Sequence, residues 1–199
     1  MYPFHTRGWA ILAGGCALSI LAVIVSYWWV GLLFVLLGVF GLWFHRNPSR
    51  TVPENTAVVS PTDGTVRRVE ECPDTGGSIV TVYLGLSDVH FIRSIRTGRI
   101  ESVERYSGKN LPALFSMSEK NNRVTFTYES GDEVTMFTGV LARRLLPLID
   151  TPMNLSKGSR IGLISFGSRV QFTLTTQSVD SIQVSEGDEV IAGETPILK

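Results

Sequence analysis

The stretch GWAILAGGCALSILAVIVSYWWVGLLFVLLGVFGLWF, residues 8–44, divides the chain into two parts of different character. Its 37 residues include no Asp, Glu, Lys, Arg or His, so all 36 acidic and basic residues lie in the other 162 positions. As one helix it would be about 55 Å long, whereas the hydrocarbon core of a membrane is about 30 Å thick. We therefore expect two transmembrane helices, at about residues 9–26 and 28–44, with a tight turn near Ser26–Trp29.

Basic residues flank this apolar stretch on both sides. Arg7 precedes it and Arg46 and Arg50 follow it, so the positive-inside rule predicts that both ends lie on the cytoplasmic side of the cell membrane. A cleavable signal peptide would have an apolar region of only about 7–15 residues. Residues 1–50 are thus expected to form a membrane anchor and its exit, with a single re-entrant or tilted anchor as the alternative. The rest of the chain would then be cytoplasmic.

The remainder of the chain, residues 51–199, has the composition of a soluble domain. The whole chain carries 18 basic and 18 acidic residues, so no net field favours nucleic acid as a partner. Its two cysteines, Cys16 and Cys72, fall in different parts of the chain and predict two unpaired thiols. No cysteine or histidine spacing typical of a metal site occurs, and we expect no metal.

Short segments rich in β-branched and aromatic residues follow one another after residue 50, separated by turns such as Pro61–Gly64, Asp74–Gly77 and Glu129–Asp132. This pattern predicts a mainly β fold, a compact β barrel or sandwich, with two short helices at Leu111–Glu119 and Val140–Leu148. The expected strands are Ala57–Ser60, Thr65–Val69, Ser78–Leu84, Val124–Tyr128, Glu133–Phe137, Arg160–Ser165, Val170–Thr175 and Ser181–Val184.

Two segments near opposite ends of this domain resemble each other in kind. Ser60–Val66 is a turn that leads into a strand, and Glu186–Leu198 alternates turns with short strands. Both patterns are typical of lipoyl-like hairpins, although ordinary β-turn chemistry accounts for them equally well.

Three residues of this domain could form a nucleophilic set. His90 is its only histidine, Asp63 lies in a Pro-x-Asp-Gly turn, and Ser168 follows Gly167. A Ser–His–Asp set requires proximity in space and permits any order along the chain. Each residue also has a plainer interpretation, as a structural histidine, a turn aspartate and one serine among many.

Five motifs follow one another along the chain: FHRNPSR (44–50), SPTDG (60–64), SDVH (87–90), GVLARR (139–144) and RIGLISFGSRV (160–170). They fall in the order seen in phosphatidylserine decarboxylases, and the chain resembles the short bacterial and archaeal form of that family over almost its whole length. The C-terminal motif GDEVIAGET (187–195) also matches this family.

The resemblance implies a proenzyme that cleaves itself between Gly167 and Ser168. Residues 1–167 would form the large chain and residues 168–199 the small chain, and the two would stay associated, with a higher oligomer left open. Ser168 would become a covalent pyruvoyl group, with His90 as the base that activates it and Asp63 orienting the imidazole. A Schiff base between the pyruvoyl and the serine amine of phosphatidylserine would allow decarboxylation to phosphatidylethanolamine, so the substrate is a phospholipid in the bilayer.

The chain departs from longer family members at Ser87, where these have a second histidine; His90 is then the first candidate for proton donor to the carbanion. Arg93, Arg143 and Arg144 are candidates for holding the lipid phosphate. Two other readings of the residues compete with the resemblance. One is a membrane-anchored lipoyl-like adaptor module, and the other is a membrane serine hydrolase that uses Ser168, His90 and Asp63.

Overall fold

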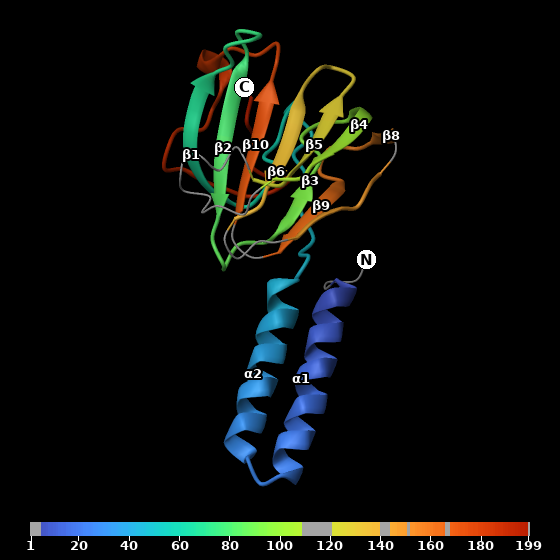
Figure 1. Ribbon diagram of the computed structural model, residues 1–199. Coiled ribbons are helices and arrows are strands. Elements are labelled where there is room, and N and C mark those ends of the chain that lie inside the picture. The colour runs from blue at the N-terminus through green and yellow to red at the C-terminus, as the bar shows by residue number, and fades with distance from the viewer. Residues whose placement is uncertain (1–4, 109–120, 140–143, 151, 166–167, 199) are drawn as a thin grey trace. The chain divides into compact units, whose positions relative to one another are not determined.

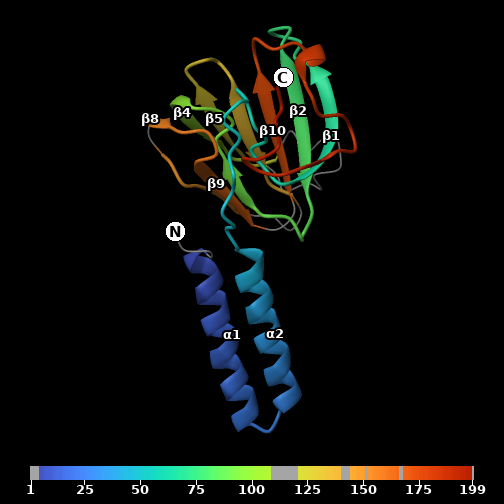
Figure 2. The same cartoon turned by 180° about the vertical axis from the view of Figure 1, so that it is seen from behind.

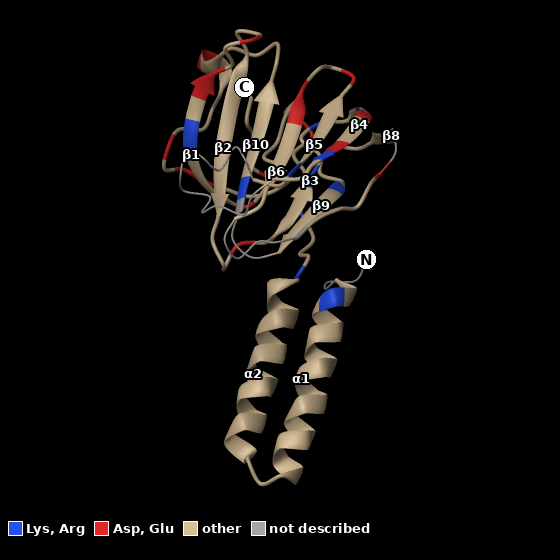
Figure 3. Cartoon of the chain, in the orientation of Figure 1, with Lys and Arg blue, Asp and Glu red and all other residues tan. Residues whose placement is uncertain are grey.

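The chain divides into two compact units, Met1–Ser49 and Arg50–Lys199. The computed structural model describes residues 5–108, 121–139, 144–150, 152–165 and 168–198, and for Arg144 and Ser168 it describes the backbone alone (Figure 1). The charged residues gather in the second unit, and the two helices of the first unit are uncharged except for Arg7 (Figure 3).

The first unit is a pair of antiparallel helices, α1 (Thr6–Ile24) and α2 (Trp28–Phe44). Ser26 takes φ 65°, and this left-handed residue reverses the chain between them. Glycines allow close packing, since a Cβ on Gly41 would lie 2.4 Å from Ile11 Cγ2, and one on Gly15 would lie 2.6 Å from the Phe34 carbonyl oxygen.

Among the described residues, α1 is the one helix whose length and composition suffice to cross a membrane. It has 19 residues, and the more apolar α2 has 17. An apolar N-terminal helix of this kind gives weak support to membrane association. Two spans, and the side on which their ends lie, stay predictions.

The second unit contains two antiparallel sheets, which confirms the mainly β prediction. The strand order of the large sheet is β11 (Glu189–Val190), β1 (Gly64–Glu71), β2 (Ser78–Leu84), β10 (Ser168–Leu174), β6 (Glu133–Phe137), β5 (Arg123–Tyr128), β4 (Gly98–Tyr106) and β8 (Met153–Leu155). The small sheet has the order β3 (Phe91–Arg93), β9 (Arg160–Ser165) and β7 (Arg144–Pro147). A short 3₁₀ helix, η2, covers Val179–Ser181.

Of the predicted barrel or sandwich, the barrel is wrong, because neither sheet closes on itself within the described residues. In the described part of the chain, β11 and β8 are the two edges of the large sheet and pair only with β1 and β4. These edge strands have two and three residues. Very short edge strands are a common way to leave a sheet open without exposing a long row of unpaired backbone groups.

The hydrophobic core lies between the sheets. On β10, Val170, Phe172 and Leu174 are fully buried, as expected for every second residue of a strand. The sheets approach closely where β9 meets β6, since a Cβ on Gly162 would lie 2.6 Å from Met136 Sδ. A side chain at position 162 would therefore require the end of the Met136 side chain to shift.

The helix predicted at Val140–Leu148 is wrong in its described part. Arg144–Pro147 forms β7, whose residues pair with Ser165 to Gly162 of β9. Apolar runs this short fit a helix or a buried strand equally well, and the neighbouring strand decides between them. Residues 140–143 and the helix predicted at Leu111–Glu119 lie outside the described residues.

Two predicted strands shrink to single bridges. Within Ala57–Ser60 only Val59 pairs, with Pro196, and within Ser181–Val184 only Ile182 pairs, with Leu198. The segment from Arg50 to β1 crosses one face of the large sheet without forming a strand of its own (Figure 2).

The two segments that resemble each other in the sequence pair with one another. Gly64 and Thr65 of β1 lie opposite Val190 and Glu189 of β11, and the Ser60 amide donates to the Thr195 carbonyl at 2.9 Å. The C-terminal tail is thereby attached to the Pro61–Gly64 turn. Their lipoyl-like character stays a prediction.

Candidate functional site

Ser168 stands at the junction of the two sheets. It is the first residue of β10, where its Cα lies opposite Leu84 at the end of β2. The preceding described residue is Ser165, the last of β9 in the small sheet. The Gly167–Ser168 bond therefore belongs to the short passage from one sheet to the other, of which residues 166–167 lie outside the described residues.

His90 is fully buried and is held at both its main chain and its ring. Its carbonyl accepts the Ile164 amide of β9 at 3.0 Å, and its ring Nδ1 lies 2.8 Å from the Asp88 carbonyl oxygen. A carbonyl oxygen can only accept a hydrogen bond, so Nδ1 carries the proton in this arrangement. In the neutral ring, Nε2 is then the basic nitrogen.

The chain path brings His90 close to the Gly167–Ser168 junction. Ile164, bonded to His90, precedes Ser168 by four residues, which span at most about 14 Å of extended chain. Leu84, opposite Ser168, precedes His90 by only six residues. The histidine is thus tied to the junction from two directions.

Asp63 is the centre of a polar cluster. Arg50 Nη2 donates to both carboxylate oxygens, at 2.8 and 2.6 Å, and the Ala192 amide donates to Oδ1 at 2.8 Å. The Arg50 and Asp63 side chains are only 11% and 15% exposed. In the described part of the chain Arg50 and the Ala192 amide are the hydrogen-bond partners of the Asp63 carboxylate, so orientation of His90 by Asp63 stays a prediction.

Arg93, a candidate for holding the phosphate, lies beside this cluster. Its guanidinium Nη1 donates to the Gly158 carbonyl at 2.8 Å, and the side chain is buried. Burial lowers the pKa of Arg93 from its usual value, and the positive charges of Arg50 and Arg160 lower it further. Of the other two candidates, Arg143 is outside the described residues and only the backbone of Arg144 is described. All three stay predictions.

Sequence reasoning missed three groups of this site: the Arg50 side chain, the Ala192 amide and the Asp88 carbonyl. The sequence contains a signal for Arg50, because this residue ends the FHRNPSR motif. Its charge alone, however, predicts only that it flanks the membrane segment. The other two are main-chain groups, which every residue has, so no residue type could reveal them.

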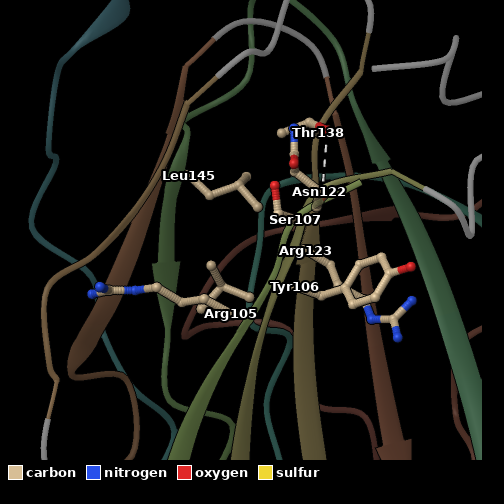
Figure 4. Close-up of a pocket in the computed structure, with 8 residues that line it drawn as sticks. Arg105, Tyr106, Ser107, Asn122, Arg123, Thr138 and Leu145 are labelled. Carbon is tan, nitrogen blue, oxygen red and sulfur yellow. Dashed lines mark hydrogen bonds between the residues drawn. The ribbon is translucent and has the colours of Figure 1, made fainter. Parts of the chain in front are cut away.

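A cavity of about 220 Å³ opens at the neighbouring strand ends (Figure 4). Ser107, Asn122, Thr138 and Leu145 surround it, and Arg123 stacks on the Tyr106 ring with its Cζ 4.3 Å from the ring centroid. Thr138 follows Phe137, which lies opposite Arg169 of β10. The Thr138 side of the cavity therefore lies at the end of β6, the strand next to β10 in the large sheet. Among the described residues, no group of three His, Cys, Asp or Glu side chains could hold a metal ion.

Comparison with known proteins shows the family. The family model for phosphatidylserine decarboxylase matches residues 37–198. A phosphatidylserine decarboxylase proenzyme of Symbiobacterium thermophilum is 37% identical, covering 96% of this chain and 93% of that protein. Proteins of the same name from Carboxydothermus hydrogenoformans and Neisseria gonorrhoeae are 33% and 34% identical, covering 95% and 100% of this chain and 92% and 80% of their own length. The chain belongs to the phosphatidylserine decarboxylase family.

Proposed function

We propose that this protein decarboxylates phosphatidylserine to phosphatidylethanolamine after cleaving its own chain between Gly167 and Ser168. Family membership supports the reaction. The observation that carries the proposed site is the buried His90, whose Nδ1 bond leaves Nε2 basic and whose main chain is attached to β9 just before the junction.

Self-cleavage uses groups of the chain itself. His90 Nε2 takes the proton of the Ser168 hydroxyl, and the oxygen attacks the Gly167 carbonyl carbon, replacing the peptide bond by an ester. Loss of the Ser168 α-proton then expels the Gly167 carboxylate and leaves a carbon–carbon double bond at position 168. Water converts this residue to a pyruvoyl group and ammonia. Asp63 is the acidic residue of the proposed Ser–His–Asp set.

The start of β10 suits a pyruvoyl group derived from Ser168. Cleavage would make position 168 the beginning of a chain, while pairing of β10 with β2 and β6 would keep it in place. The pyruvoyl group supplies a ketone that binds the substrate amine and withdraws electrons as CO₂ leaves. We expect His90 to hold and return a proton at this position, because Ser87 stands where longer family members have a second histidine.

The substrate is a membrane lipid, which gives the apolar first unit a role. We expect residues 1–50 to anchor the enzyme through two helices, with residues 51–199 at the cytoplasmic surface of the cell membrane. The large and small chains would stay associated, because β10 lies inside the large sheet rather than at its edge.

Mass analysis of the purified protein under denaturing conditions tests this proposal. The expected small chain has 32 of the 199 residues, about 3.5 kDa of the 21.9 kDa total, and has no free N-terminal amine. Phosphatidylserine labelled in the serine carboxyl should release labelled CO₂, and cyanoborohydride should attach the substrate to the small chain.

Two variants serve as controls. Ser168→Ala should stay in one piece because the nucleophilic hydroxyl is absent, and His90→Ala should stay intact or cleave very slowly. A small chain that begins with an ordinary Ser168 amine would indicate proteolysis by another enzyme. Absence of labelled CO₂ from the cleaved protein would contradict the decarboxylase assignment.

A further inference from the structure

The turn Gly85–Asp88 connects the two sides of the cleavage site. It begins directly after Leu84, whose Cα lies opposite Ser168, and ends two residues before His90. From His90 the path continues through the bond with Ile164 to β9 and back to Ser168. The turn is therefore the shortest described link between the partner strand of the serine and the histidine.

The Asp88 side chain closes this turn. Its Oδ2 accepts the Gly85 amide at 2.7 Å, and the Asp88 amide donates to the Gly85 carbonyl at 3.3 Å. Side-chain bonds of this type to the backbone three residues earlier hold a short turn in one conformation. With the turn closed, the Asp88 carbonyl oxygen lies 2.8 Å from His90 Nδ1.

We propose that Asp88 is a positioning residue for self-cleavage. Its carboxylate holds the Gly85–Asp88 turn, and its main-chain carbonyl accepts the Nδ1 proton of His90, which keeps Nε2 deprotonated and directed to the nucleophile. This inference rests on the proposed role of His90 as the base. It assigns to a backbone carbonyl the orienting bond that a carboxylate makes in a Ser–His–Asp set.

The remaining contacts of Asp63 fit this division of roles. Its carboxylate is bonded to Arg50 and to the Ala192 amide, so it joins the start of the second unit to the C-terminal tail. Asp63 then contributes a fixed charge and a structural tie, while the His90 tautomer is set by Asp88. Asp63 and Asp88 variants should differ accordingly.

The chain contains a matched control for Asp88. In the Ser185–Asp188 turn, Asp188 Oδ2 accepts the Ser185 amide at 2.8 Å, and the Asp188 amide donates to the Ser185 carbonyl at 3.1 Å. This turn has the same two bonds but precedes β11 at the edge of the large sheet. Removing the Asp188 carboxylate tests what loss of such a turn costs when no histidine depends on it.

The first test measures the rate of self-cleavage in the full chain. Asp88→Ala should slow cleavage by at least about tenfold, because a misplaced general base loses much of its effect. Asp88→Asn should restore most of the rate, since the amide oxygen still accepts the Gly85 N–H. Asp188→Ala should cleave at the rate of the unaltered chain. Equal rates in Asp88→Ala and Asp188→Ala would overturn the proposal.

The second test reads the tautomer directly and needs no catalytic activity. The chain has only three histidines, so ¹⁵N-histidine spectra of the intact Ser168→Ala precursor at about pH 8 are simple to assign. His90 should carry its proton on Nδ1, and Asp88→Ala should populate the other tautomer. A His90 ring protonated on Nε2 in the precursor would overturn the proposal, whereas a wild-type chain that never cleaves would overturn the proposed function instead.

Discussion

The bond between Arg50 and Asp63 is the best-defined ion pair of the site. Both side chains are largely buried, and one guanidinium nitrogen contacts both carboxylate oxygens. Arg50→Gln would leave the buried Asp63 carboxylate with the Ala192 amide as its hydrogen-bond donor among the described residues. We expect the free energy of unfolding to fall by about 1–3 kcal/mol, as measured by urea denaturation of the Ser168→Ala precursor.

Arg68→Gln is the matched control for this variant. Arg68 also forms an ion pair, with Glu70 at 3.6 Å, but the two side chains are 64% and 45% exposed. Its removal should change the free energy of unfolding by less than about 0.5 kcal/mol. Equal losses in the two variants would mean that burial of the Arg50–Asp63 pair contributes nothing.

At the same scale, the sequence could single out His90 and Ser168 as candidates but could not predict their surroundings. His90 stood out because no other histidine occurs after residue 50, and Ser168 stood out through the motif around it. The bonds that define the site join residues far apart in the chain, such as Asp63 with Ala192. Proximity of this kind follows from the sheet pairing, which no local pattern contains.

Among the elements, three strands that are mostly buried and bounded by turns were predicted well. Ser78–Leu84, Glu133–Phe137 and Arg160–Ser165 have the predicted bounds. The nine-residue β4 was missed, because it includes four charged residues and its pairing with β5 shifts by one residue between Ile100 and Ser102. Such a bulge breaks the two-residue period on which strand prediction depends.

Glu133 of β6 gives the large sheet a pH dependence that can be measured. Burial raises the pKa of Glu133 above its usual value of 4.5, and the charge of Glu104 raises it further. Because the pKa is higher in the folded chain than in the unfolded chain, ionisation of Glu133 weakens the fold as the pH rises above that value. Glu133→Gln should therefore be more stable than the unaltered chain at about pH 7.

That gain should vanish at about pH 4, where the unaltered glutamate is itself largely protonated. Urea unfolding of both chains at the two pH values measures the difference, and Glu129→Gln, at an exposed glutamate in the turn after β5, provides the control. A gain for Glu133→Gln that is the same at both pH values would rule out ionisation as its cause.

For the whole molecule, the topology explains how one chain could become two without falling apart. Residues 168–199 supply β10, which pairs with β2 and β6, and β11, which pairs with β1. Fully buried Val170, Phe172 and Leu174 belong to this segment. Cleavage at Gly167–Ser168 would cut the chain between sheets while leaving these strands in place.

The division between Ser49 and Arg50 leads to a final prediction about the whole chain. A shortened protein that starts at Arg50 keeps the Arg50–Asp63 pair and should cleave itself at the rate of the full chain, measured by the appearance of the small chain. A protein that starts at Thr51 loses the pair and should lose about 1–3 kcal/mol of stability, as Arg50→Gln does.

The form that starts at Arg50 should act poorly on phosphatidylserine in vesicles but regain activity on a short-chain, water-soluble substrate, because it lacks the apolar helices that would concentrate it at the membrane. Failure of this form to cleave would show that the helical unit is required for the β unit to fold.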